Sequence, residues 1–169
     1  VTGVQTCALP ISRLEGQPAG DVKTNIDKLA AFDYATRTGA ARLIRRATPA
    51  EAVPALTQAV RSHADAFVRY RALVLLTAFN DPTTPDLMRG LLGDSNDRLR
   101  EVAYRWLEQH PDPRLTQTLL AALNTEQAEF VRPALIRAVT ATAATDPAVQ
   151  RALIAEVGRG LDFFRSAVI

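Results

Sequence analysis

The chain has 169 residues, 47% hydrophobic and 22% charged, which is the composition of a folded domain and unlike that of a disordered segment. A net charge of +2, from 20 Lys and Arg against 18 Asp and Glu, is too small to indicate nucleic-acid binding from bulk charge. The sequence has no apolar run of about 18 residues, so we expect a soluble protein without a membrane partner. Nothing in it indicates a cellular compartment.

Residues 1–11, VTGVQTCALPI, lack the basic start and continuous apolar stretch of a secretion signal. All of them match the translation of a common short-read sequencing adapter, so we expect this segment to be non-native. Cys7, the only cysteine, lies in it without a second Cys or a nearby His, which argues against a redox site. We expect residues 12–20 to form a loop.

An internal repeat runs through residues 21–169. Each copy has an acidic residue followed three or four positions later by an arginine, and the arginines are spaced 32, 31, 32 and 33 residues apart. The pairs are Asp33–Arg37, Asp65–Arg69, Asp97–Arg100, Glu129–Arg132 and Asp162–Arg165. In the four complete copies, the positions three, six and seven after each arginine are apolar. This pattern predicts an amphipathic helix that begins near the arginine.

A shorter apolar helix is predicted before each of these helices, and prolines mark the boundaries between copies. Asp precedes Pro at 81–82, 112–113 and 146–147, and Asp as N-cap with Pro at the first helical position is a helix-start signal. The sequence therefore predicts helical hairpins over residues 21–48, 49–81, 82–112 and 113–146, with an incomplete one over 147–169. We expect the chain to be truncated at both ends, so that its missing continuation beyond Ile169 would pack on the last hairpin.

These paired helices resemble HEAT repeats, in particular the short HEAT-like type first associated with phycobilisome lyases. DAFVRYRALVLLTAFNDP (65–82), with its D-x-x-[VL]-R-x-x-A motif, carries the resemblance best, and it extends over about residues 21–169. The resemblance implies an all-α fold, a HEAT/armadillo-like α-solenoid with about four to five hairpins stacked as a right-handed superhelix. The acidic residues would then cap helix starts, and the arginines would pair with them within or between repeats as a structural ladder.

We predict no catalytic, metal or cofactor site. His63 and His110 have no His or Cys at metal-ligand spacing, and both fall near predicted loops. No G-x-S-x-G motif or glycine-rich phosphate loop is present. On the helix after Arg100, we expect Trp106 to be buried and Tyr104 to be half-buried.

The second helices carry a broken row of basic residues, because the position five after each repeat arginine reads Arg42, Val74, Arg105 and Arg137. Second helices line the concave surface in the family that the chain resembles. The candidate binding face consists of Arg42, Arg45, Tyr70, Arg105 and Arg137. Such a row suits an acidic peptide or a phosphate backbone, although Glu101 and Glu108 on the same face argue against nucleic acid. A solvated face with ordinary ion pairs would give the same pattern.

The sequence favours a non-catalytic repeat scaffold that binds another macromolecule, a protein or peptide, through its concave second-helix face. Two alternatives remain at this stage. The chain could be an accessory HEAT domain of a larger enzyme or lyase-like protein, or it could bind nucleic acid or another acidic ligand through the arginine row. This functional hypothesis follows from fold analogy, which is a weak basis for function.

Overall fold

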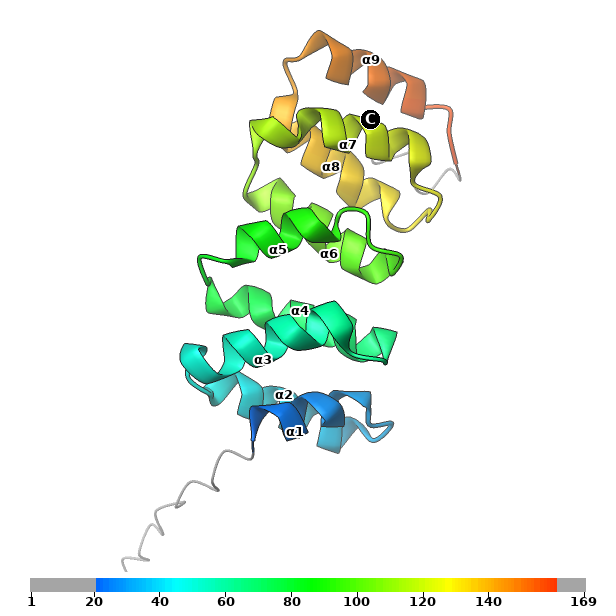
Figure 1. Cartoon of the computed structure of the whole chain (residues 1–169). Helices are drawn as coiled ribbons and strands as arrows, with labels where there is room; N and C mark the ends of the chain where they lie inside the picture. Colours follow the sequence, from blue (N-terminus) through cyan, green and yellow to red (C-terminus); the bar gives the residue numbers. More distant parts are fainter. Residues whose placement is uncertain (1–20, 161–169) are drawn as a thin grey trace, which may run out of the picture.

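The computed structural model describes residues 21–160, and every regular element in that range is a helix (Figure 1). The α-helices are α1 (Val22–Asp27), α2 (Tyr34–Arg46), α3 (Pro49–Ser62), α4 (Ala66–Leu76), α5 (Thr84–Leu91), α6 (Asp97–Gln109), α7 (Thr116–Thr125), α8 (Arg132–Ala143) and α9 (Pro147–Glu156). Short 3-10 helices are η1 (Lys28–Ala30), η2 (Thr77–Phe79) and η3 (Pro113–Leu115). The adapter-like segment, residues 12–20, Asp162 and Arg165 lie outside the described residues.

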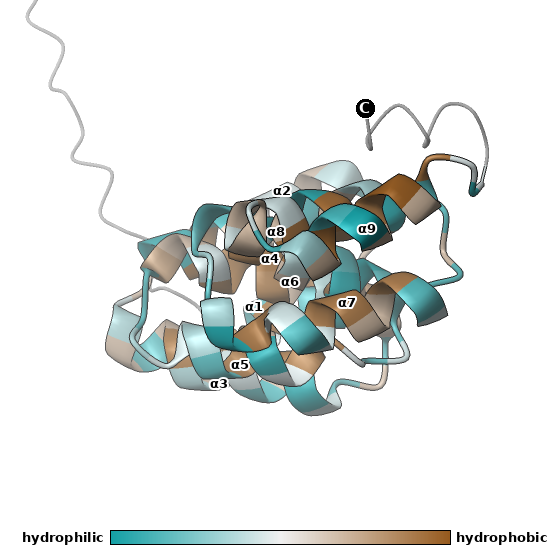
Figure 2. Ribbon diagram, turned by 90° about the horizontal axis from the view of Figure 1, so that it is seen from above, coloured by the Kyte–Doolittle hydropathy of each residue, from teal (hydrophilic) through white to brown (hydrophobic). Residues whose placement is uncertain are grey.

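The helices pair into hairpins that stack on one another. The hairpins α1/α2, α3/α4, α5/α6 and α7/α8 follow each other in chain order, and α9 packs beyond them (Figure 1). Viewed from above, α1, α3, α5 and α7 lie on one side and α2, α4, α6 and α8 on the other (Figure 2). We call α2, α4, α6 and α8 the second-helix layer. The prediction of an all-α solenoid is confirmed, while the exact repeat boundaries stay a prediction.

Two acidic residues of the repeat, Asp33 and Asp65, cap helix starts as expected, whereas Glu129 does not, because the N-cap of α8 is Val131. Asp33 accepts a hydrogen bond from the Thr36 amide at 2.6 Å, and Asp65 accepts from the Phe67 amide at 2.7 Å. Each carboxylate thereby satisfies a backbone donor that the first helical turn leaves free. In the third repeat the cap is Asn96, so Asp97 becomes the first residue of α6.

One predicted helix start is wrong. Asp81 and Pro82 do not begin α5; Asp81 instead accepts from the Thr83 amide at 2.9 Å in a turn, and α5 begins at Thr84. The physical reason is a second proline, Pro85, which also fits the first turn of a helix and allows the start two residues later.

The apolar core lies between the two layers, where the predicted stripes meet. Most positions three, six and seven after each repeat arginine are buried; these are Ala40, Ile44, Ala72, Leu75, Leu76, Ala103, Leu107, Leu135, Ala138 and Val139. The expectations for two aromatic residues are reversed. Tyr104 is fully buried and donates to the Leu92 carbonyl at 3.2 Å, whereas Trp106 is only partly buried and stacks on the His110 ring.

Three of the repeat arginines, those from the second repeat onward, each join their own hairpin to the following repeat. Arg69 donates to Asp94 at 2.5 Å, Arg100 donates to both carboxylate oxygens of Glu126 at 2.7 and 2.8 Å, and Arg132 donates to Glu156 at 2.5 Å. In every case the acceptor belongs to the following repeat. We call these three pairs the inter-repeat ladder.

The ladder corrects the expected pairing. Asp65 and Asp97 are not the partners of Arg69 and Arg100, because the first caps α4 and the second begins α6. Among the described pairs, the ion pair expected within one repeat is present for Arg132 and Glu129, at 3.4 Å. The ladder carboxylates are partly or fully buried between repeats, whereas Asp65 is exposed, and a charge-assisted pair is stronger where water is excluded.

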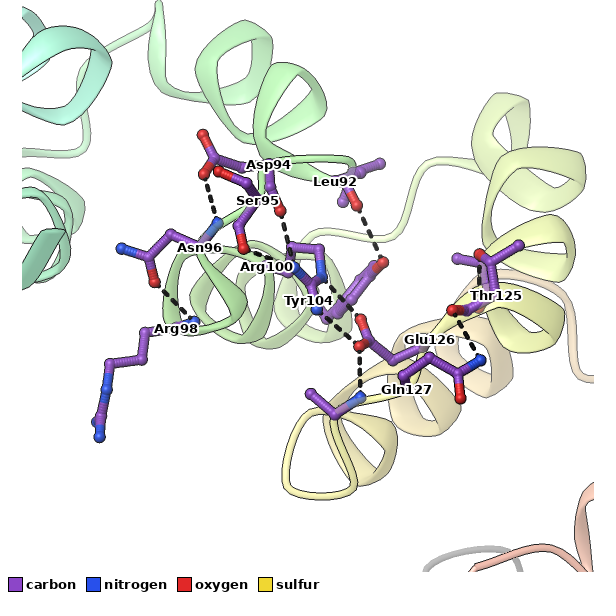
Figure 3. A network of polar contacts seen from close by, with 12 residues as sticks. Leu92, Asp94, Ser95, Asn96, Arg98, Arg100, Tyr104, Thr125, Glu126 and Gln127 are labelled. Atoms are coloured by element: carbon purple, nitrogen blue, oxygen red, sulfur yellow. Dashed lines mark hydrogen bonds and ion pairs between the residues drawn. The ribbon is translucent and has the colours of Figure 1, made fainter.

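The Arg100–Glu126 pair shows how tightly the ladder is built (Figure 3). Glu126 also accepts from the Ala128 amide at 2.9 Å, while Arg100 donates to the Asp94 carbonyl at 2.8 Å. Burial alone would raise the pKa of Glu126, but the hydrogen bonds from Arg100 and Ala128 outweigh it and leave the pKa below its ordinary value. Burial raises the pKa of the neighbouring Tyr104 to about 12, so its hydroxyl remains a donor.

As far as the structure describes the chain, the first repeat lacks such a pair. Asp94 and Glu126 each accept the amide two residues further on, and His63 takes the corresponding place, accepting from the Asp65 amide through Nδ1 at 3.0 Å. A histidine in this role offers no carboxylate to Arg37. Arg37 donates instead to the Ala31 and Phe32 carbonyls of its own hairpin, at 2.9 and 3.1 Å.

Glu126→Gln tests the ladder through its pH dependence. Because the folded-state pKa of Glu126 is lowered, its charge stabilises the fold above the ordinary value of 4.5, and this contribution is lost as the pH falls through the lowered pKa. We expect the variant to lose about 2–4 kcal/mol of unfolding free energy at neutral pH. The loss should shrink as the pH falls through the lowered pKa of Glu126, because the protonated side chain resembles Gln.

The measurement is urea unfolding of the full chain across that pH range. Glu101→Gln serves as the control, because Glu101 pairs with Arg105 within one turn of α6 and should change stability by less than about 1 kcal/mol. A loss for Glu126→Gln that stays constant with pH would contradict the assignment.

Candidate binding face

The predicted binding residues all lie on the second-helix layer, but on different helices. Arg42 and Arg45 belong to α2, Tyr70 to α4, Arg105 to α6 and Arg137 to α8. All four arginines are exposed, and Tyr70 is half-buried. They do not form one uniform basic row, because their surroundings differ between the two ends of the layer.

On α6 and α8 the charges of the two predicted arginines are neutralised locally. Arg105 pairs with Glu101 one turn earlier at 2.8 Å, and Arg137 reaches across to Glu108 on α6 at 3.1 Å. Exposed pairs of this kind contribute little to stability, but each places a carboxylate beside the guanidinium. A phosphate backbone approaching this half of the layer would meet Glu101 and Glu108 as well as the arginines.

On α2 the basic residues have no carboxylate partner. Within residues 21–160 no acidic group lies at ion-pair distance from Arg42, Arg45 or Arg46, and all three are exposed. Arg45 and Arg46 lie in the last turn of α2, where positive charge interacts favourably with the helix dipole. The α2 end of the layer therefore presents uncompensated positive charge.

A cavity of about 200 Å³ lies beside this charge, between α2 and α4. It is lined by Leu29, Ala41, Arg45, Tyr70, Arg71, Val74 and Leu75. Arg71 lies over the Phe67 ring, 4.2 Å from its centroid, and Phe67 in turn stacks on Tyr70 with the ring centroids 6.2 Å apart. Arg45 and Tyr70, two of the predicted residues, thus meet at one cavity.

Sequence reasoning missed Arg71. It lies two residues after the repeat arginine, where the next two repeats have Val102 and Ala134. The signal was present in the internal alignment, because a charged residue at a place that is otherwise apolar indicates a local change of environment. Burial, followed by the positive charge of Arg37, lowers the pKa of Arg71, although the group remains charged at neutral pH.

Two other cavities contain polar groups that already bind one another. One, of about 340 Å³, includes Arg100, Tyr104 and Glu126 of the inter-repeat ladder. The other, of about 440 Å³, lies between α1 and α3 and includes His63, whose Nε2 is 3.4 Å from Asp27.

The part of the chain described here holds no cluster of three or more His, Cys, Asp or Glu side chains suited to a metal ion. Within the same residues, none of the helices combines the length and apolar character needed to cross a bilayer.

Stacked helical hairpins with a continuous layer of second helices define an α-solenoid. A family model described as HEAT repeats matches residues 22–103 and, in a second overlapping alignment, residues 53–140. The chain belongs to the HEAT-repeat family, whose members generally act as protein-interaction scaffolds and are typically non-catalytic. The search of curated proteins returned no match. The narrower resemblance to the lyase-associated type stays a prediction.

The structure separates arginines that hold the stack from arginines that face solvent. Arg132 is 3% exposed and its removal would leave the buried Glu156 with a weaker partner, so Arg132→Ala should lower the unfolding free energy by about 2–4 kcal/mol. Arg137→Ala removes an exposed pair and should cost less than about 1 kcal/mol. Urea unfolding of both variants measures the difference, and similar losses for the two would contradict the assignment.

Proposed function

We propose that the chain is a non-catalytic scaffold that binds an acidic segment of another protein on the second-helix layer, at the end formed by α2 and α4. The observation that carries the proposal is the unequal distribution of charge along this layer. Within residues 21–160, Arg42, Arg45 and Arg46 on α2 have no acidic partner, whereas Arg105 and Arg137 each have one.

A protein partner is favoured over nucleic acid by the same distribution. A duplex or single strand carries phosphates at regular spacing and would follow the basic row over several helices. Here the row is interrupted by Val74 and by the carboxylates of Glu101 and Glu108. A short acidic segment needs only the α2 end, and its apolar residues can pack on exposed side chains such as Val74.

The proposal also agrees with the general role of HEAT repeats. Members of the family act as protein-interaction scaffolds, and the repeat architecture offers an extended surface made of equivalent helices. Long-range attraction between uncompensated arginines and an acidic segment speeds association and weakens with added salt.

Peptide selection with the full chain tests this function. We expect a displayed library of random peptides to yield acidic sequences, whose affinity for the chain is then measured by fluorescence anisotropy. Arg42→Glu should weaken binding by about tenfold or more, because it reverses an unpaired charge on the proposed face. Arg105→Glu should weaken it by less than about threefold, since Glu101 already neutralises Arg105.

Arg61→Glu on α3 is the matched control, because it makes the same charge change on an exposed position of the opposite layer. Equal losses for Arg42→Glu and Arg61→Glu would contradict a specific face. Tighter binding of a DNA duplex than of any selected peptide, with a steep dependence on salt, would contradict the choice of a protein partner.

A further inference from the structure

The first interface of the second-helix layer departs from the repeat pattern at two positions that face each other. Four residues after the repeat arginine, α4 and α6 have Leu73 and Tyr104, both buried, whereas α2 has the small Ala41. Two residues after the arginine, α4 has Arg71 where α6 has Val102. The small residue leaves space between α2 and α4, and the arginine places a charge beside that space.

The lining of the cavity combines basic and apolar residues. Arg45 and Arg71 are the basic ones, while Leu29, Ala41 and Leu75 are apolar. No acidic residue is among the described side chains that line it. Its volume of about 200 Å³ is below the roughly 300–1,000 Å³ of pockets for small molecules and cofactors, so it suits a single side chain.

No acidic side chain among residues 21–160 pairs with Arg71. Its Nε is buried without a hydrogen-bond acceptor in the described part of the chain. An unpaired buried guanidinium nitrogen is unfavourable, and the nearby positive charge of Arg37 adds repulsion. An anion placed in the cavity would relieve both effects.

We propose that the α2–α4 cavity is an anchor site for a glutamate side chain of the bound protein segment. The glutamate carboxylate accepts hydrogen bonds from Arg45 and Arg71, and its methylene groups pack on Ala41 and Leu75. The proposal rests on the proposed function, because it names the residue that the second-helix layer recognises. Recognition by two guanidinium groups provides geometric specificity as well as charge.

Glutamate is favoured over a phosphate group by the lining of the cavity. A phosphate is polar over its whole surface, and burying it against leucine and alanine would remove hydration without replacing it. A glutamate side chain has an apolar stem that matches the leucine and alanine surface and a carboxylate that matches the two arginines. Phosphate is therefore the competing outcome in the test.

The first experiment probes the cavity without a protein partner. N-acetyl-glutamate amide is titrated into isotope-labelled full chain, and the Arg71 Nε–H signal is followed by NMR after assignment from its absence in Arg71→Val. We expect a saturable shift at millimolar concentrations, no such shift with N-acetyl-glutamine amide, and loss of the shift in Ala41→Leu. Either no shift with the glutamate probe or a stronger saturable shift with inorganic phosphate overturns the proposal.

The second experiment uses acidic peptides selected on the full chain. Ala41→Leu fills the cavity as Leu73 does in the next repeat, and Arg71→Val introduces the residue type found at Val102. Both should leave the melting temperature close to that of the original chain, and both should weaken peptide binding by about tenfold or more. Replacing the anchoring glutamate of the peptide with glutamine should also weaken its binding to the original chain by about tenfold or more. The same replacement should change its affinity for the Arg71→Val variant little, because the interaction is already lost there.

The two proposals fail in different ways. If no peptide is selected, the scaffold function fails, and the glutamate probe still decides the chemistry of the cavity. If selected peptides bind Ala41→Leu and Arg71→Val as tightly as the original chain but lose affinity for Arg42→Glu, the scaffold function stands and the anchor site is overturned.

Discussion

From the second repeat onward, the position of each hairpin on the next depends on one interaction. The arginine near the start of the second helix forms an ion pair with a carboxylate of the following repeat. Burial of apolar side chains between the layers supplies most of the free energy of folding, but it has no direction and tolerates many relative positions of two hairpins. The Arg100–Glu126 pair restricts these positions, because a planar guanidinium bound to both carboxylate oxygens accepts few geometries. Arg100 also binds the Asp94 carbonyl, so the same side chain fixes its own loop and the next hairpin.

This division of roles explains where binding chemistry is available. The ladder arginines bind their carboxylate partners, and the pairs on α6 and α8 neutralise Arg105 and Arg137. Arg42, Arg45 and Arg46 on α2 have no acidic partner within residues 21–160, and they lie next to the α2–α4 interface, where Ala41 stands in place of a large residue. Because the repeats share one pattern of residues counted from the repeat arginine, the departures from it at Ala41 and Arg71 can be recognised as local features.

The sequence was sufficient to predict the fold. The arginine period gives the length of the repeat, and the apolar stripes show that each repeat contains amphipathic helices. It was not sufficient to predict the partners of the arginines. The acidic residue at each helix start is regular in sequence, whereas the true partners Asp94, Glu126 and Glu156 occupy slightly different positions in loops and at a helix end. The burial of Tyr104 and Trp106 was reversed because it depends on how neighbouring hairpins rotate, which the pattern of one helix does not contain. The neutralisation of Arg105 by Glu101 could be recognised, because a spacing of four residues on a helix is local.

His63 stands where the later repeats have a ladder carboxylate, so the first hairpin differs from the others in how it is joined to its neighbour. Arg69, Arg100 and Arg132 all bind forward along the chain, so the hairpins from α3/α4 onward are linked in series, while no such pair joins α1/α2 to α3/α4 within the described residues. In a nearest-neighbour description of a repeat protein, the free energy of each interface limits how far unfolding spreads. The α2–α4 interface is thus held without a ladder pair, and α2 also carries the exposed Arg42, Arg45 and Arg46. A protein segment bound across α2 and α4 would stabilise that interface, so binding and local stability would be coupled there.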